Sequence, residues 1–245
     1  MANAGLTSSN LATLSTSSIA MLGSAGVAGI SSAEMLGLTS SQAAALTSAD
    51  ALGLTSANIA GLTTAAILGL TSTNIAGLSA GAASGLTSTQ LGALTTKAIS
   101  SLGSAAASGL SSAGLAGLSS AQVAVLTSTE LSNLNSTAIP GLTTAGIRGL
   151  TATNIAWLST AAASEFTSAQ LGALTTSDVS GLSSADVRAL ATANLGGLGS
   201  AQIAALGTAA INAATAQVNA LTSAQINVLT SAQIGALATA YLAAF

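Results

Sequence analysis

Leucine recurs every eight residues from residue 6 onward, and the hydrophobic pattern of the chain is built on this period. The units run from 6–13 to 237–244, and one of them, 214–220, is a residue short. In the other 29 units the first position is Leu in 27, the exceptions being Ile30 and Phe166. A short period sustained over a whole chain predicts a repeat protein built as a one-dimensional stack of similar units.

The consensus unit is Leu-Thr-Ser-Ala-Gln-Ile-Ala-Gly/Ala, well represented by residues 54–61 and 229–236. One continuous helix is excluded, because eight residues at about 100° each turn by about 800° and leucine would advance by about 80° per unit. Leucine would then spiral round the helix and form no single apolar face. The backbone must therefore change direction within each unit.

Capping signals favour one short helix per unit. Position 2 is Ser or Thr in 22 of the 29 full units, as expected for an N-cap. Position 5 is then N3, where a capping box requires a side chain that can accept from the N-cap backbone. The hydrophobic residues at positions 1 and 6 form the staple pair N′ and N4. Position 5 is filled in this way by Asn58, Gln90, Gln122, Glu130, Gln170, Gln225 and Gln233.

Glycine at position 8 is expected to be the C′ residue that ends each helix, as at Gly61, Gly69, Gly77, Gly117 and Gly149. The next leucine then lies at C″, where it can pack back on the turn. Each leucine would in this way close one helix and begin the next.

The few charges agree with helices. Five of the six acidic residues occupy position 5, in the first turn, and both arginines occupy position 7, in the last turn. This order suits the helix dipole, and a β-strand offers no reason for it. Pro140, also at position 7, falls at a helix end. The residues concerned are Glu34, Asp50, Glu130, Asp178 and Asp186 at position 5, and Arg148 and Arg188 at position 7.

The predicted fold is an all-α solenoid of short, one-to-two-turn helices with one helix in each eight-residue unit. A β-solenoid is the alternative, since regular Thr, Ser, Ile and Leu with Gly also suit stacked strands. Abundant Ala disfavours strands, and positions 1 and 6 would point to opposite faces of an uninterrupted strand.

Position 5 tends to alternate between polar and small residues in successive units, for example Asn58, Ala66, Asn74 and Ala82. This alternation predicts two units per turn of the solenoid, which is a 16-residue coil. The segment 70–96 resembles 150–176, which lies five such coils further along the chain.

The domain organisation follows from the repeat. We expect an N-terminal lead at 1–5 and a single solenoid over 6–244, of which the Ala-rich end, 198–245, forms a C-terminal cap region. The short unit, 214–220, is a place where two neighbouring helices could fuse.

Composition narrows the possible partners. Only 4% of the residues are charged, and such a surface favours self-association, end to end or lateral. Three basic residues cannot neutralise enough phosphates for nucleic-acid binding. Mean hydropathy is +0.73, yet each unit carries polar residues, so no membrane span is predicted. The start of the chain lacks the basic and apolar regions of a secretory signal peptide.

No catalytic, cofactor-binding or metal site is predicted, and we expect the protein not to be an enzyme. The chain has no His or Cys to bind a metal, and its serines lack a base. Asp178 and Asp186 lie in adjacent units, where solvated positions and an ion pair with Arg188 are favoured over an acid/base pair. The segment 196–199 (GGLG) has no strand or lysine of a phosphate loop. Trp157 is interpreted as a surface anchor or a gap filler.

Units 198–205 (LGSAQIAA), 221–228 (LTSAQINV) and 229–236 (LTSAQIGA) resemble the LTTAQIAAL-type octapeptide repeats of large bacterial secreted and cell-surface proteins. The resemblance implies an extracellular or cell-surface structural role and no site residues. The function expected is a structural repeat protein that self-assembles into a filament, sheath or surface layer. The alternative is an adhesin-like or ice- or glycan-binding module, with cell-surface glycan as a partner.

Overall fold

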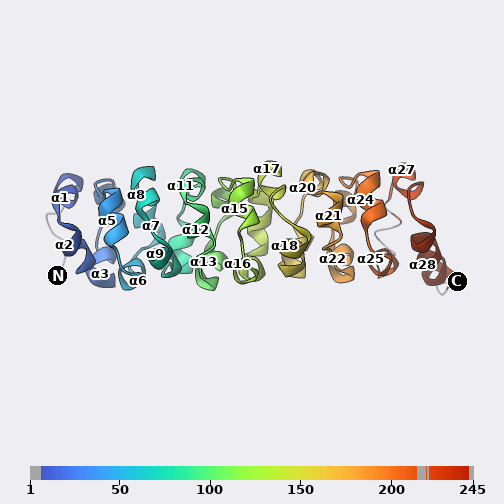
Figure 1. Ribbon diagram of the computed structural model, residues 1–245, viewed down its shortest axis with the longest axis horizontal. Helices are drawn as coiled ribbons and strands as arrows, with labels where there is room; N and C mark the ends of the chain where they lie inside the picture. Colours follow the sequence, from blue (N-terminus) through green and yellow to red (C-terminus); the bar gives the residue numbers. More distant parts are fainter. Residues whose placement is uncertain (1–6, 214–218, 220, 243–245) are drawn as a thin grey trace.

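The computed structural model describes residues 7–213, 219 and 221–242, and it shows an elongated all-α solenoid with its two ends far apart (Figure 1). The all-α prediction is confirmed, and the β-solenoid is wrong for the described residues, which contain no strand. The predicted lead at 1–5 and most of the short unit 214–220 lie outside the described residues. No described helix is long and apolar enough to cross a membrane.

The helices follow the eight-residue units along the chain. The first half contains α1 (Ser8–Thr13), α2 (Thr16–Ala20), α3 (Gly23–Ala28), α4 (Ser32–Met35), α5 (Ser40–Ala45), α6 (Ser48–Ala51), α7 (Ser56–Ile59), α8 (Thr64–Gly69), α9 (Ser72–Ala76), α10 (Ala80–Ser84), α11 (Ser88–Ala93), α12 (Thr96–Ile99), α13 (Ser104–Gly109) and α14 (Ser112–Leu115). The second half contains α15 (Ser120–Ala124), α16 (Ser128–Asn133), the 3₁₀ helix η1 (Ser136–Gly141), α17 (Thr144–Ile147), α18 (Ala152–Trp157), α19 (Thr160–Ser164), α20 (Ser168–Ala173), α21 (Thr176–Val179), α22 (Ser184–Ala189), α23 (Thr192–Leu195), α24 (Ser200–Ala205), α25 (Thr208–Ala213), α27 (Ser223–Ile226) and α28 (Ser231–Leu242).

The unit 54–61 shows how the local sequence produces one helix. Thr55 is the extended N-cap of α7, and its hydroxyl accepts from the backbone N–H of Asn58 at 3.2 Å. The Asn58 carboxamide oxygen accepts in return from the Thr55 N–H at 2.8 Å, which completes the predicted capping box. The helix ends where the N–H of Leu62 donates to the carbonyl of Ile59 at 3.1 Å. Position 2 is therefore the N-cap, as predicted.

The role predicted for glycine at position 8 is wrong. A C′ cap needs a positive φ, yet Gly77 and Gly85 have φ of −84° and −86°, and Gly23 is the only described residue with positive φ. These glycines lie instead where two backbones meet. A Cβ atom on Gly61 would lie 2.0 Å from the carbonyl oxygen of Ser32, which belongs to the preceding coil. The missing side chain therefore allows successive coils to touch.

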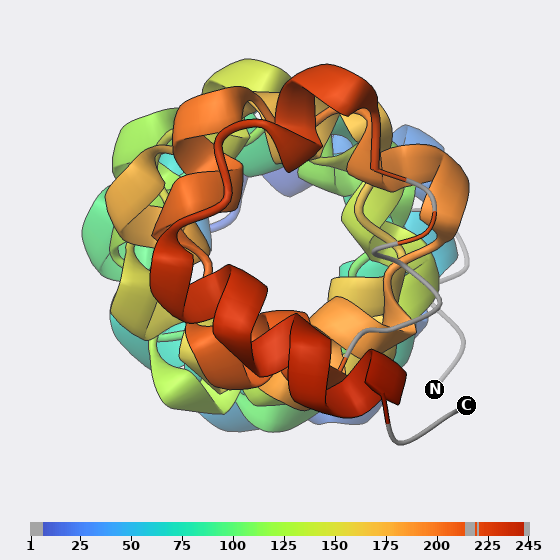
Figure 2. The same cartoon turned by 90° about the vertical axis from the view of Figure 1, so that its right-hand side faces the viewer.

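The number of units per coil also differs from the prediction. The helix pairs in closest contact are three apart in chain order, for example α5 with α8 and α10 with α13. Hydrogen bonds join side chains to carbonyls 28 and 31 residues earlier, and 28/8 is three and a half units. The end-on view shows these short helices winding round a common axis (Figure 2). The predicted 16-residue coil is wrong.

At position 5 the type of residue alternates between units, but the side of the solenoid that it faces does not. The polar Gln90 and the small Ala98 both lie in the interior, at 3% and 2% exposure. Position 5 therefore faces the interior in successive units, whichever residue occupies it. The polar residues donate to carbonyls of the preceding coil, as Gln90 does, whereas at Gly114 the carbonyl oxygen of Leu86 would lie 3.0 Å from a Cβ atom. The alternation is therefore not evidence that alternate units lie on opposite sides.

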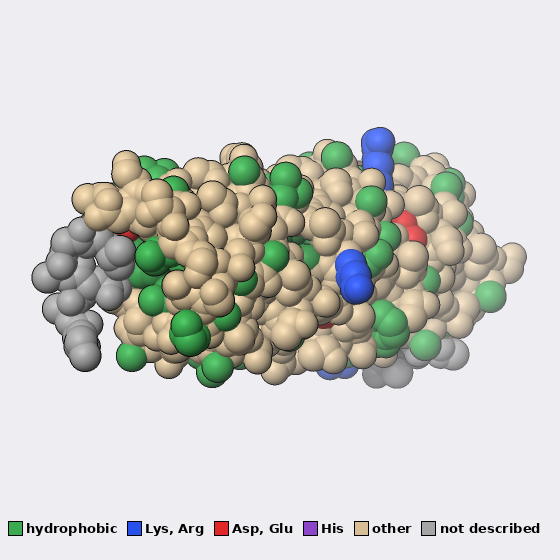
Figure 3. All heavy atoms as spheres, turned by 60° about the vertical axis from the view of Figure 1, so that its left-hand side comes forward, with side chains coloured by type: hydrophobic (Ala, Val, Ile, Leu, Met, Phe, Trp, Pro, Cys, Tyr) green, Lys and Arg blue, Asp and Glu red, His purple; other side chains and the backbone are tan. Residues whose placement is uncertain are grey.

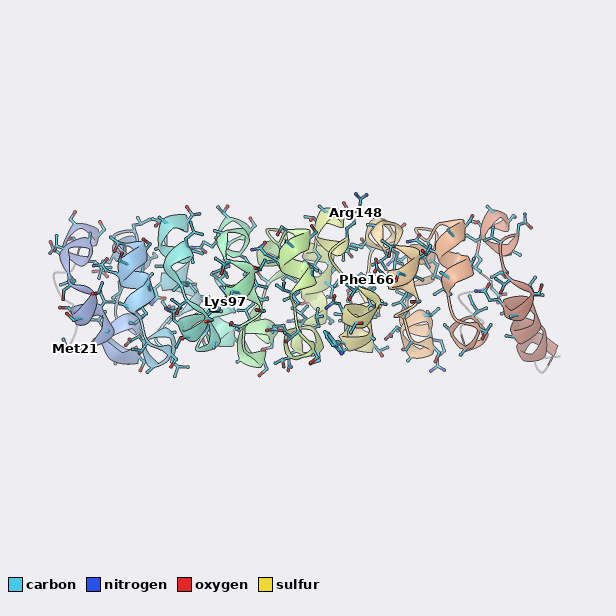
Figure 4. All side chains as sticks on the ribbon, in the orientation of Figure 1. Met21, Lys97, Arg148 and Phe166 are labelled. Atoms are coloured by element: carbon cyan, nitrogen blue, oxygen red, sulfur yellow. The ribbon has the colours of Figure 1, made fainter. Side chains whose placement is uncertain are left out.

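The core is continuous along the solenoid. The leucines at position 1 and the aliphatic residues at position 6 form one cluster of buried side chains. Phe166 replaces leucine at position 1 and is fully buried within the wall (Figure 4). Since each coil buries the apolar side of the one before, the stack derives its stability from contacts between neighbouring coils.

Candidate functional site

The most distinctive set of side chains is a ladder of buried amides between coils. Gln90 shows the arrangement. Its Oε1 accepts from the backbone N–H of Thr87 at 3.0 Å, which caps its own helix. Its Nε2 donates to the carbonyls of Ile59 and Leu62, at 2.9 and 2.8 Å, in the preceding coil. One side chain therefore caps the start of its own helix and donates to carbonyls at the C-terminal end of a helix in the preceding coil.

The same contact recurs along the solenoid, and we call it the amide ladder. Each of its amides donates to one or more carbonyls 27 to 31 residues earlier. A buried carbonyl without a donor costs about 1–3 kcal/mol, so the ladder sets the register of the coils as well as holding them together. Its members are Gln42, Asn58, Asn74, Gln90, Gln122, Asn154, Gln170, Asn194, Gln202, Gln225 and Gln233.

Four of the five carboxylates at position 5 are buried and cannot complete the ladder: Asp50, Glu130, Asp178 and Asp186, all at most 5% exposed. In Glu130, Oε2 accepts from the backbone N–H of Thr127 at 2.7 Å and from its hydroxyl. An ionised carboxylate has no proton to donate to the carbonyls of the preceding coil. The solvated positions predicted for Asp178 and Asp186 are therefore wrong, because each carboxylate is buried against its own N-cap.

Replacing Glu130 by Gln is expected to raise the free energy of unfolding by about 1–2 kcal/mol at pH 7, since the amide gains donors that the carboxylate lacks. Urea denaturation followed by circular dichroism measures this change. Glu165→Gln is the matched control, because Glu165 is exposed and lies outside the ladder, and it should change stability little. A Glu130→Gln variant less stable than the parent protein would contradict the ladder.

The remaining charges lie on the surface. On the face shown in Figure 3, charged side chains are few and hydrophobic ones are scattered. Arg148 extends outward from the rim of the solenoid (Figure 4). The backbone N–H and the hydroxyl of Ser31 donate to Glu34, and these bonds hold the pKa of its carboxyl below the ordinary value. Within the described ranges, no group of three or more His, Cys, Asp or Glu could hold a metal ion.

The other residues singled out by sequence have local roles. Trp157 is 39% exposed at the end of α18, so it is only partly covered by its neighbours. Gly199 lies in the 196–199 segment, and its N–H donates to the ladder residue Gln202 at 2.6 Å. It therefore belongs to a helix start.

The C-terminal units of the chain are similar to a known sequence repeat. Residues 179–213 and 214–239 match the ALTTAQ repeat. The resemblance proposed from the octapeptide sequence is thereby confirmed for this part of the chain. Earlier units, such as 54–61, lie outside the matched residues but have the same N-cap and capping box as the ALTTAQ units. No curated protein and no solved structure matches the chain.

Proposed function

We propose that this protein is a non-catalytic structural element that assembles with copies of itself into an extracellular filament, sheath or surface layer. The single observation that supports the proposal best is a solenoid whose buried polar side chains, over the described residues, serve helix caps and contacts between coils. Only 4% of the residues of the chain are charged, and so few charges oppose association weakly. The resemblance of the ALTTAQ units to bacterial secreted and cell-surface repeats supports the extracellular location.

A binding module for ice or glycan is the alternative function. It relies on rows of hydroxyls, yet the N-cap hydroxyls of Thr63, Thr95 and Thr143 already accept bonds from backbone N–H groups. The structural proposal is therefore favoured. Thermal hysteresis or glycan binding by a dispersed monomer would favour the alternative.

Electron microscopy and sedimentation velocity of the purified full chain test the proposal. The expected result is ordered assemblies at micromolar concentration, in equilibrium with few monomers. Dispersed monomers throughout that range would contradict the structural role. Circular dichroism of the same sample verifies that the chain is folded and helical.

A further inference from the structure

Glu130 is a buried carboxylate in the place of a ladder amide. Like Gln122 in the preceding unit it occupies position 5, and its Oε2 caps its own helix by accepting from the Thr127 N–H at 2.7 Å. Its other oxygen, Oε1, corresponds to the nitrogen of the amide, and no donor in the described part of the chain bonds to it. The side chain is 1% exposed, so a buried oxygen of a charged group is left without a partner.

The preceding coil presents a group of carbonyl oxygens to position 5. The amide of Gln122 shows their arrangement, because its Nε2 lies 3.2, 3.2 and 2.7 Å from the carbonyl oxygens of Leu91, Gly92 and Leu94. Three carbonyls therefore converge on the place where the outer atom of a position-5 side chain lies.

The corresponding carbonyls for Glu130 are eight residues further on, at Ile99, Ser100 and Leu102. The helix of Glu130, α16, contacts α13 of the preceding coil, and Leu102 lies two residues before α13 begins. The Ile99 carbonyl accepts from the Leu102 N–H at 3.1 Å, whereas no group among the described residues donates to the Leu102 carbonyl. The repeat therefore brings acceptors alone together where other units have an amide nitrogen.

Glu130 is also the carboxylate whose length suits this position. Asp50, Asp178 and Asp186 are buried at the same repeat position, but their side chains are one methylene shorter than that of glutamine. Glutamate and glutamine have the same length, so Glu130 extends as far toward the preceding coil as Gln122 can.

We propose that a dehydrated monovalent alkali cation, Na⁺ or K⁺, binds between Glu130 Oε1 and the carbonyls of the preceding coil. Carboxylate and carbonyl oxygens suit hard cations, and backbone carbonyls can replace the hydration shell of an alkali ion. The charge of such an ion balances that of the single carboxylate, whereas a divalent ion would leave a net charge buried. The ion joins two coils, as the amide does in other units.

Thermal unfolding of the full chain, followed by circular dichroism, tests this site with NaCl or KCl as the probe. Tetramethylammonium chloride replaces the alkali salt at equal ionic strength, because its cation is too large for a buried site. The parent protein should unfold about 3–10 °C higher in the alkali salt, as expected for a ligand at about ten to a hundred times its Kd. An unfolding temperature that is the same in both salts would overturn the proposal.

Two variants show whether the shift comes from this site. Glu130→Gln removes the carboxylate and supplies the missing amide, so its unfolding temperature should not depend on the choice of salt. Glu165→Gln is the matched control, because it removes the same charge from an exposed position and should keep the shift of the parent. The stability gap between Glu130→Gln and the parent should be largest in tetramethylammonium chloride. An equal shift in all three proteins would overturn the cation site and leave the structural function intact.

Discussion

Replacing Gln90 by Glu is expected to lower the free energy of unfolding by about 2–4 kcal/mol at pH 7. The buried carbonyl of Leu62 loses its side-chain donor, and the carbonyl of Ile59 keeps only the backbone N–H of Leu62. The oxygen that caps the Thr87 N–H is retained, so the change isolates the bonds from the amide nitrogen to the preceding coil, at Ile59, Ala60 and Leu62. Urea denaturation followed by circular dichroism measures the loss. The loss should shrink as the pH falls, since the introduced carboxylic acid regains one proton to donate.

The control for Gln90→Glu is Gln90→Met, which has a similar length and no charge. It should be destabilised at every pH, because methionine can neither donate to the carbonyls nor cap Thr87. A Gln90→Glu protein as stable as the parent at pH 7 would contradict the role of the amide ladder.

Replacing Gly149 by Ala is expected to destabilise the solenoid by about 1–3 kcal/mol, the usual range for overpacking. A Cβ atom at this position would lie 2.0 Å from the carbonyl oxygen of Ser120, so the two coils must separate locally. Val125 occupies the same repeat position in another unit, so the prediction concerns those units whose glycine touches the preceding coil. Thermal and urea denaturation measure the effect.

Gly81→Ala provides the matched control for Gly149→Ala. Gly81 lies inside α10, where the nearest atom to a new Cβ would be the Ser79 Oγ at 3.8 Å, an ordinary contact. Alanine also favours the helix by about 0.5–1 kcal/mol, so this variant should be as stable as the parent or slightly more so. If both variants behave alike, the close approach of coils at Gly149 does not determine stability.

The helical unit could be predicted from sequence because its signals are local. An N-cap at position 2 and an acceptor at position 5 both act within one turn of one helix, as Thr55 and Asn58 do. The repeat period then places one such helix in every unit. These contacts require no knowledge of the rest of the chain.

The coil could not be predicted in the same way. The angle between successive helices depends on the extended backbone at positions 1 and 2, such as φ −89° and ψ 167° at Thr71, and on backbone contacts between neighbouring coils, such as Gly61 with Ser32. The eight-residue period carries no information about either. The two-unit alternation at position 5 therefore suggested a 16-residue coil. In the structure this alternation concerns only the type of residue, because position 5 faces the interior in successive units.

One signal for the amide ladder was present in the sequence. A capping box needs only an acceptor at position 5, and Glu serves that purpose as well as Gln. The preference for Gln and Asn over Glu and Asp in this chain, with six acidic residues in all, therefore indicates a need for a donor. The partners of that donor, such as Leu91 and Leu94 for Gln122, became visible only in the folded coil.

The length of the coil is the claim on which both the ladder and the glycine contacts depend. Double electron–electron resonance tests it directly, since the chain has no Cys and accepts a pair of spin labels cleanly. Residues 60, 76 and 89 are all exposed. In the structure, Ala60 lies beside the following coil, because the Gln90 amide donates to its carbonyl at 3.4 Å.

Labels at Ala60 and Thr89 should therefore lie closer together than labels at Ala60 and Ala76, which are two units, and so a little over half a coil, from each other. Stacked helices lie about 8–10 Å apart, so the first pair should give the short distance. A shorter distance for the second pair is the result expected of a 16-residue coil, and it would contradict this account.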